Sequence, residues 1–219
     1  QVDFGGTTHT FAEGETTMII EGDNGTLTIA TDGSYTYVKA DGDGGTPAET
    51  VSVGGSDADA QDWADAGVTI SAFDFGTSYT DENGNFDAAN ADDNAQFSST
   101  GIGVEGTQGA GQASSQIEYD SQSGDSEALA LTFDTSVSSA DVTVSRLFHG
   151  EGNDGEQGQW QAFDSDGNLV GTGDINDTTV TYDGSSNVGT MSIDLGGTAF
   201  STIVFTATEM SGSGSDFKI

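Results

Sequence analysis

Ala128-Leu-Ala-Leu-Thr-Phe133 carries the clearest structural signal in this chain. Thr26-Leu-Thr-Ile-Ala30 and Thr202-Ile-Val-Phe-Thr-Ala-Thr208 are of the same kind. These segments are rich in β-branched and aromatic residues, and several of them alternate strictly, as strands with one buried face do. Disordered chains lack such segments, so the sequence predicts a folded protein built from strands.

Further strand candidates recur from Val68 onward, between polar and glycine-rich loops. Short strands at this spacing, without intervening helices, predict an all-β fold and favour a jelly-roll-like β-sandwich. One short helix is expected, because Ser56-Asp-Ala-Asp59 resembles a capping box that opens a helix through Trp63 to Gly67. The strand candidates are 68–75, 96–100, 116–119, 127–133, 141–148, 159–163, 168–172, 178–182, 190–195 and 201–208.

The N-terminal part predicts a small β-hairpin unit. Thr26–Ala30 should pair with Ser34–Lys39 across Asp32-Gly33, because a type I′ turn needs positive φ angles. Thr16-Thr-Met-Ile-Ile20 is a further strand candidate beside them. Residues 40–50 are rich in glycine and carry the only proline of the chain. This stretch predicts a boundary between a part at residues 1–45 and a larger part at residues 51–219.

The charge of the chain restricts its partners. Lys and Arg together number 3 against 37 Asp and Glu, which gives a formal net charge of −34. Nucleic acid and anionic membranes are excluded as partners, because both need clustered cations and the three here are far apart in sequence: Lys39, Arg146 and Lys218. Something must neutralise the carboxylates in the folded state, and several Ca²⁺ ions bound by hard oxygen ligands would do so. A halophilic origin is the alternative.

Several other functions lack their residues. Without cysteine, neither disulfides nor thiolate metal sites are available. No run approaches the roughly 18 apolar residues that a membrane span needs, and no signal peptide is recognisable at the N-terminus. Enzyme motifs are absent, and only His9 and His149 are available as neutral-pH bases. We therefore expect no enzymatic activity.

The loop between the predicted strands 141–148 and 159–163 is the best candidate for a functional calcium site. It carries three carboxylates, Glu151, Asp154 and Glu156, among glycines. Glycines let backbone carbonyls turn inward beside carboxylates, and Ca²⁺ takes six to eight oxygen ligands. Gln157 could hydrogen-bond an anionic ligand held by the ion. A solvated acidic loop is the alternative.

Three further acidic features are candidate metal sites. Asp164-Ser-Asp166-Gly-Asn168 has the opening of an EF-hand loop, but Ile175 stands where that loop has its bidentate Glu. An ordinary hairpin turn is therefore the favoured interpretation, although Asp164 and Asp166 remain candidate ligands. Asp81-Glu-Asn83-Gly-Asn85-Phe-Asp87 also offers alternate side-chain oxygens, with a solvated loop as the alternative. Glu127 and Asp216 could meet around a structural ion where the first and last strands of a sandwich come together.

Arg146 follows Val142 and Val144 on the alternating face of its predicted strand. It could be a buried partner of a carboxylate or part of a ligand site, and the buried pair is favoured.

Two stretches resemble modules of giant, type I-secreted bacterial adhesins of the RTX class. Gly25-Thr-Leu-Thr-Ile-Ala-Thr-Asp-Gly-Ser-Tyr-Thr-Tyr37 is similar to the end of their cadherin-like or immunoglobulin-like extender repeats. Residues from about 100 to 219 are similar to their calcium-dependent peptide-binding domain. The matching pieces occur in order: 101–104, 117–120, 126–129, 147–148, 156–160, 162–170, 200–207 and 215–217.

This resemblance implies a monomeric β-sandwich at residues 51–219 that holds several Ca²⁺ ions. It would grip the C-terminus of a peptide or protein on a cell surface, with one ion contacting the free carboxylate. Residues 1–45 would belong to a flanking or split Ig-like or cadherin-like domain. The resemblance further implies an extracellular location on the bacterial surface, and roles in adhesion and biofilm formation.

Two alternatives stay open. One is a calcium-dependent, carbohydrate-binding jelly roll in which Trp160 stacks on a sugar. The other is a structural extender domain with filled calcium sites and no ligand pocket.

Overall fold

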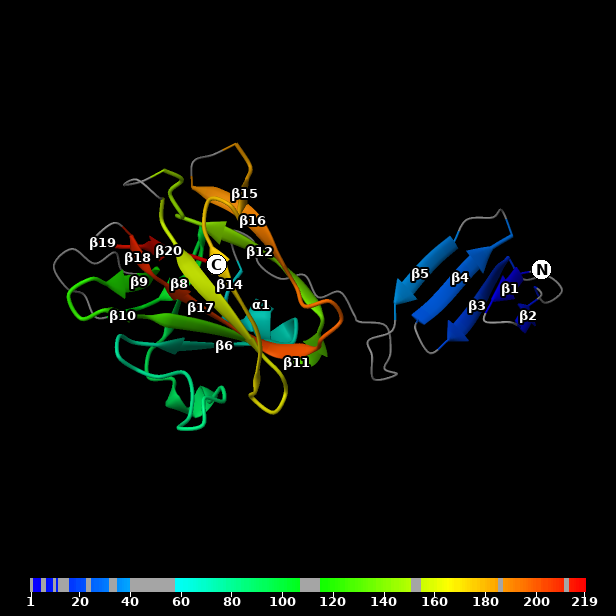
Figure 1. The fold of residues 1–219 in the computed structure, drawn as a ribbon, viewed down its shortest axis with the longest axis horizontal. Helices are drawn as coiled ribbons and strands as arrows, with labels where there is room; N and C mark the ends of the chain where they lie inside the picture. Colours follow the sequence, from blue (N-terminus) through cyan, green and yellow to red (C-terminus); the bar gives the residue numbers. More distant parts are fainter. Residues whose placement is uncertain are drawn as a thin grey trace. The chain divides into compact units, whose positions relative to one another are not determined.

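The computed structural model describes most of the chain, which divides into two compact units, residues 1–50 and 51–219 (Figure 1). No helix within the described residues is long and apolar enough to cross a membrane. The described residues are 2–4, 7–9, 11, 16–22, 25–31, 35–39, 58–106, 115–150, 155–184, 187–210 and 213–219.

The first unit consists of strands. β3, β4 and β5 form an antiparallel sheet in this order, and β1 pairs with β2. Along β3 the side chains alternate, because Met18 and Ile20 are buried while Ile19 is 65% exposed. The predicted pairing of 26–30 with 34–39 is confirmed by β4 and β5. The strands are β1 (Val2–Phe4), β2 (Thr7–His9), β3 (Thr17–Gly22), β4 (Gly25–Ala30) and β5 (Tyr35–Lys39).

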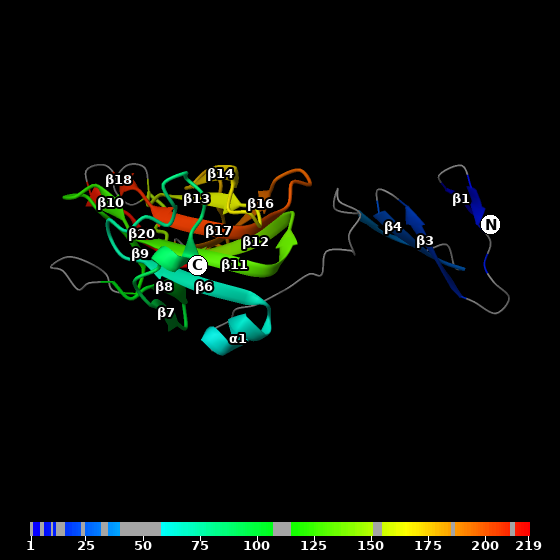
Figure 2. The ribbon, with the colours of Figure 1, turned by 90° about the horizontal axis from the view of Figure 1, so that it is seen from below.

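The centre of the second unit is a five-stranded antiparallel sheet with the order β14-β13-β17-β11-β6. Figure 2 shows β17, β11 and β6 edge to edge. Both faces of this sheet are buried, since Ala128 and Ala130 pack in one cluster while Leu129 and Leu131 pack in another. The strands are β6 (Val68–Phe73), β11 (Ala128–Val137), β13 (Gly158–Phe163), β14 (Leu169–Ile175) and β17 (Phe200–Ala207).

A three-stranded sheet of β12 (Ser139–Ser145), β16 (Val188–Asp194) and β15 (Thr181–Tyr182) supplies a second layer. Its residues Val142, Val144, Met191 and Ile193 share the main core with Leu129, Leu131, Ile203 and Phe205 of the central sheet. Apolar side chains of two sheets thus meet across one core, as in a sandwich. The all-β, sandwich-like fold expected from the strand pattern is confirmed.

The opposite face of the central sheet is covered by the connection after β6. Tyr79, Phe86 and Ala91 from this connection pack on Phe73 and Phe163 of the sheet. The rings of Phe73 and Tyr79 meet edge to face, with centroids 6.2 Å apart, a favourable geometry for aromatic pairs. This cover holds residues 74–92 against the sheet. It also contains a single 3₁₀ turn, Ala88–Asn90.

A cluster of short strands closes one end of the second unit. β9 lies between β10 and β20, so the segments at 117–120, 125–126 and 216–217 run side by side. Ile102 and Ile219 also exchange two backbone hydrogen bonds, of 2.6 and 3.0 Å. The strands are β7 (Ala95–Ser98), β8 (Gly101–Val104), β9 (Ile117–Asp120), β10 (Asp125–Ser126), β18 (Glu209–Met210), β19 (Ser213–Gly214) and β20 (Asp216–Phe217).

The expected helix is present as α1 (Ala60–Asp65), but its cap differs from the expectation. The N-cap is Asp59, and Asp62 completes the capping box, whereas the sequence had suggested Ser56. Asp59 Oδ1 accepts the backbone N–H of Gln61 at 2.9 Å, and the backbone N–H of Asp59 donates to Asp62 Oδ2 at 2.9 Å. The capping box thus keeps the expected three-residue spacing, but it consists of Asp59 and Asp62 and begins three residues later than expected.

Arg146 is not a buried core residue, so the favoured interpretation of it was wrong. β12 ends at Ser145, and Arg146 adopts φ 63°, in the left-handed region. This angle breaks the alternation of the strand. The side chain of Arg146 is consequently exposed, while Val142 and Val144 remain in the core.

Candidate metal centre

Three carboxylates from distant parts of the sequence converge beside the central sheet. Asp74 follows β6, Asp93 precedes β7, and Glu127 lies between β10 and β11. One oxygen atom of each lies within 4.8 Å of the other two. Ladder contacts bring them together, because Ala72 forms a bridge with Asp93 and β6 pairs with β11. We call these three residues the acidic triad.

Glu127 is the buried acid of the triad. Its side chain is only 2% exposed. Burial, together with the negative charges of Glu118, Asp74 and Asp93, raises its pKa to about 8, although the backbone N–H of Glu118 opposes this shift. That N–H donates to Glu127 Oε2 at 3.1 Å. An acid with this pKa is poised either to hold a proton or to bind a cation near neutral pH.

No basic side chain forms an ion pair with Glu127 within the described part of the chain. The cations with described side chains are Arg146 and Lys218, and neither is among the groups that set the pKa of Glu127. A buried negative charge is costly unless it is protonated, paired or coordinated to a metal. Three carboxylates at this spacing offer the hard oxygen ligands that Ca²⁺ and Mg²⁺ prefer.

Gly106 forms one wall of the triad. Its backbone N–H donates to Asp93 Oδ2 at 3.0 Å. Its φ is +67°, and a Cβ atom built on it would lie 2.5 Å from Glu127 Oε1. A side chain at this position would therefore intrude on the space of the Glu127 carboxylate, so the close approach requires glycine here.

Replacement of Gly106 tests whether its close approach to Glu127 matters. We expect Gly106→Ala to lower the free energy of unfolding by about 1–3 kcal/mol, the usual cost of a left-handed non-glycine residue. It should also reduce the stabilisation by calcium, because the methyl group displaces Glu127. Urea denaturation with and without Ca²⁺ measures both effects.

Gly84→Ala is the matched control for this substitution. Gly84 shares a left-handed φ of +83°, but a Cβ atom there meets nothing within 4 Å. We expect it to show the backbone cost alone. An equal response of both variants to calcium would contradict a role of Gly106 at the triad.

The triad continues into a row of acids across the end sheet. Glu127 lies opposite Glu118, because the backbone N–H of Glu127 donates to the Glu118 carbonyl at 2.9 Å. On the other side of β9, Asp216 is the register partner of Glu118. Directly opposed residues of antiparallel strands project from the same face. Glu127 and Glu118 are both buried. Glu127 and Asp216 therefore do not face each other directly as predicted, since Glu118 lies between them.

Gln116 has a buried side-chain oxygen as well. Its side chain is 7% exposed, and its Oε1 atom has no hydrogen-bond partner among the described residues. Gln116 directly precedes β9, two residues before Glu118. Buried carbonyl oxygens normally have a partner, and side-chain amide oxygens are common ligands of Ca²⁺.

Two of the acids expected in the functional loop, Glu151 and Asp154, lie outside the described residues. The third, Glu156, is 3% exposed. Its oxygens accept the backbone N–H groups of Phe148 at 2.6 Å and Asp216 at 3.4 Å. Glu156 therefore links the start of the loop to β20. The backbone of Gln157 donates to Ser215 Oγ at 2.9 Å and accepts from Thr208 at 3.1 Å.

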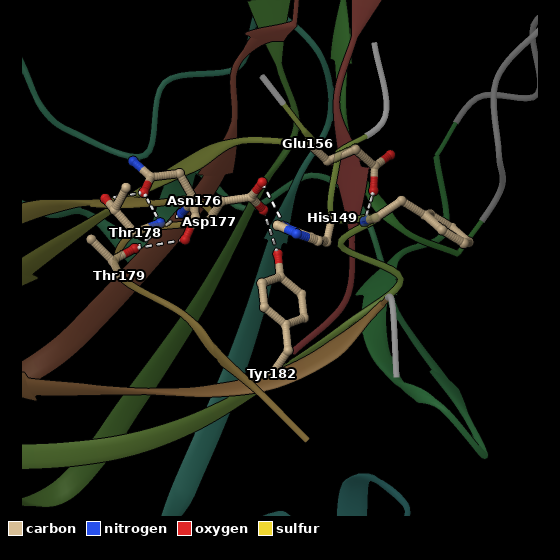
Figure 3. Close-up of polar contacts among 8 residues, drawn as sticks. His149, Glu156, Asn176, Asp177, Thr178, Thr179 and Tyr182 are labelled. Carbon is tan, nitrogen blue, oxygen red and sulfur yellow. Dashed lines mark hydrogen bonds and ion pairs between the residues drawn. The ribbon is translucent and has the colours of Figure 1, made fainter. Parts of the chain in front are cut away.

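A second cluster anchors the same loop (Figure 3). His149 and Tyr182 both point at the carboxylate of Asp177, with His149 Nδ1 2.7 Å from Oδ2 and the Tyr182 hydroxyl donating to Oδ1 at 2.9 Å. Burial, followed by the hydrogen bond and charge of Asp177, raises the pKa of Tyr182. Gly155 packs closely here, because a Cβ atom on it would lie 3.0 Å from Asp177 Oδ2. Both ends of the loop are thus held in place.

The Asp164 and Asp166 candidates lie in the turn of the β13–β14 hairpin. Asp164 Oδ1 accepts the N–H groups of Asp166 and Asn168, each at 2.9 Å. The Asn168 side chain and these N–H groups lower the pKa of Asp164. Its oxygens are therefore used to hold the turn, while Asp166 is exposed.

The 81–85 loop repeats this geometry, since Asp81 Oδ1 accepts from Asn83 and Asn85 at 2.8 and 2.9 Å. The two turns meet where Phe86 N–H donates to the Gly167 carbonyl at 2.8 Å. As in the hairpin turn, the aspartate oxygens of the 81–85 loop accept hydrogen bonds from the loop's own backbone.

Sequence reasoning missed Asp74 and Asp93, which are two acids among 37. Neither lies in a ligand-spacing motif, and they come together only because β6, β7 and β11 pack side by side. The position of Asp74 directly after a buried strand was the only signal available.

Comparison with known proteins adds no identification. No protein-family profile, no curated protein and no solved structure matches the chain. The fold and the acidic triad therefore define a class only: an all-β, sandwich-like protein with a candidate site for a hard divalent cation.

Proposed function

We propose that residues 51–219 form a calcium-stabilised binding module of a bacterial surface adhesin, without enzymatic activity. One observation carries the calcium part of this proposal: Glu127 is buried within an acidic triad, and its pKa is raised to about 8. Without a cation, Glu127 must either hold a proton or repel its neighbours. A bound divalent ion would remove this repulsion in the folded state alone, and so would stabilise the fold.

Calcium fits the donors better than other common metals. The triad offers only carboxylate oxygens, which disfavours Zn²⁺ and other metals that prefer nitrogen or sulfur. Ca²⁺ accepts six to eight oxygens in flexible geometry, whereas Mg²⁺ demands a near-ideal octahedron. The triad residues come from three separate segments, an arrangement that suits the more permissive ion. Extracellular calcium modules bind with Kd values of about 0.1–1 mM.

The ligand would bind at the loop between β12 and β13. Rigid elements hold this loop at both ends, through Glu156 at one side and the His149–Asp177 pair at the other. Loops on rigid scaffolds are where binding residues usually lie. A second Ca²⁺ held by Glu151, Asp154 and Glu156 would contact the terminal carboxylate of a peptide or surface protein. The monomeric module would act outside the cell, in a type I-secreted adhesin that promotes biofilm formation.

The carbohydrate-binding alternative has less support. Trp160 packs against the main core, and a Cβ atom on Gly173 would lie 2.6 Å from its ring. Gly173 of β14 covers one face of the indole, so only the opposite face could stack on a sugar. The purely structural extender is the remaining alternative, and it predicts no ligand at all.

A binding experiment separates these functions. We expect the calcium-loaded protein to bind immobilised peptides with free C-termini, and to lose binding in EDTA or when the peptides are amidated, because amidation removes the charge that contacts the ion. Asp154→Ala should weaken binding at least about tenfold, which corresponds to about 1.4 kcal/mol. Surface plasmon resonance on peptide and glycan arrays measures these effects.

Asp166→Ala is the matched control, because it removes one exposed aspartate from a turn outside the loop. We expect it to bind like the wild type. Equal binding of acid and amide peptides would contradict the carboxylate contact. Binding to glycans alone would favour the carbohydrate-binding alternative, and binding to neither array would favour the extender.

A further inference from the structure

Lys218 is a buried cation held by hydroxyl groups. Its side chain is 4% exposed. Its Nζ atom donates to Ser98 Oγ at 2.9 Å and to Ser115 Oγ at 3.3 Å. Both serines are partly exposed. An ammonium has three N–H donors, and the described residues accept two of them.

Arg146 directly follows Ser145, whose backbone is bridged to Lys218, so the two cationic residues are neighbours in the fold. Burial and the charge of Arg146 lower the pKa of Lys218. Neither side chain forms an ion pair with any carboxylate in the described segments. In a chain with 37 acids and 3 cations, such an arrangement of two adjacent cations is unexpected. Like charges disfavour each other, and a bound anion would offset this effect.

Backbone strain is concentrated at the same place. Ser115 and Arg146 have φ angles of 71° and 63°, and they are the non-glycine residues with positive φ within the described segments. Ser115 contacts the Lys218 ammonium. Arg146 follows Ser145, whose backbone pairs with Lys218 through hydrogen bonds of 2.9 and 2.8 Å. Strained residues of this kind cluster at ligand-binding sites, where the surrounding structure holds them.

The donors are also held rigidly. A Cβ atom on Gly101 would lie 2.7 Å from the Ile219 carbonyl oxygen and 3.1 Å from Lys218 Cβ, so the 98–101 turn closes directly on Lys218. The Ser145 hydroxyl donates to the Thr100 carbonyl oxygen at the same turn. Groups fixed in advance lose little entropy when a ligand binds.

We propose that Lys218 and Arg146, with the hydroxyls of Ser98 and Ser115, bind the carboxylate group of a singly charged ligand. A guanidinium fork and an ammonium supply complementary donors for a planar carboxylate. The net charge of −34 opposes multivalent anions such as phosphate more strongly than a monovalent one. This site contains no metal ligand, so it goes beyond the calcium-dependent function and does not rest on it.

An NMR titration tests the proposal with acetate as the probe. The ¹⁵N-labelled full chain, loaded with calcium, is titrated with sodium acetate against sodium chloride of equal ionic strength. We expect saturable shifts at the backbone amides of Ser115, Arg146 and Lys218 with acetate. Arg146→Gln should weaken acetate binding at least about tenfold, because it removes a charge-assisted hydrogen bond to the carboxylate.

Lys39→Gln is the matched control, since it removes the remaining cation and changes the net charge equally. We expect it to bind acetate like the wild type. Lys218→Met could fail to fold, so Ser98→Ala serves as the second variant and should weaken binding severalfold.

Three results would overturn the proposal: the absence of saturable shifts, tighter binding of phosphate than of acetate, or shifts confined to Gly106 at the acidic triad. An equal loss of affinity in Arg146→Gln and Lys39→Gln would overturn it as well.

Discussion

Chelation of calcium should lower the melting temperature by about 5–10 °C at neutral pH. A ligand at 100 times its Kd stabilises the folded state by about 2.7 kcal/mol. One kcal/mol corresponds to about 2–4 °C in a chain of this size. The physical reason is the acidic triad, where three carboxylate oxygens lie within 4.8 Å of one another. Differential scanning fluorimetry in EDTA and in excess Ca²⁺ measures the shift.

Two comparisons make this result specific. The shift should persist at high salt, because the buried Glu127 is screened less than surface acids are. Mg²⁺ should restore less stability than Ca²⁺. If EDTA leaves the melting curve unchanged while high salt stabilises the protein, the acidic composition reflects adaptation to salt instead.

Glu127→Gln should have opposite effects in the absence and presence of calcium. The folded-state pKa of Glu127 is about 8, above its ordinary value of 4.5. The proton on Glu127 therefore stabilises the fold fully below about pH 4.5, and this contribution is lost as the pH rises through about 8. In EDTA, the free energy of unfolding of the wild type should fall by up to about 1.4 kcal/mol per pH unit in this window.

The glutamine variant should not show this decline, because its side chain is neutral at every pH. Near pH 8 in EDTA it should be more stable than the wild type, whereas in calcium it should lose most of the stabilisation by the metal. Urea denaturation across the pH range measures both effects. Glu82→Gln is the matched control, since it removes the same charge from an exposed loop position. A variant that responds to calcium like the wild type would exclude Glu127 as a ligand.

The strand pattern was readable from the sequence because burial imposes it locally. Each of the ten predicted strand regions from Val68 onward overlaps a strand of the structure. In β11, the large side chains of Leu129 and Leu131 face one cluster and the small Ala128 and Ala130 face the other. Such local alternation survives without any knowledge of the partner strand.

The missed strands have a different origin. β8, β10, β18, β19 and β20 have two to four residues each, and glycine, serine and acids are frequent among them. Their hydrogen bonds come from neighbours distant in sequence, as when Asp216 and Phe217 pair with Glu118 and Ile117. Segments of two to four residues are too short to establish a period, so only the packed chain selects them as strands.

The composition and local pattern of this chain determine that it folds from strands, carries a large negative charge, and has a hairpin at β4 and β5. Hydrophobic alternation and turn chemistry act within a few residues, so no tertiary context is needed to recognise them. Which acids meet was decided by tertiary structure alone. Asp74, Asp93 and Glu127 converge because three strands pack side by side, and burial there raises the pKa of Glu127. With 37 acids available, spacing along the chain could not single out these three.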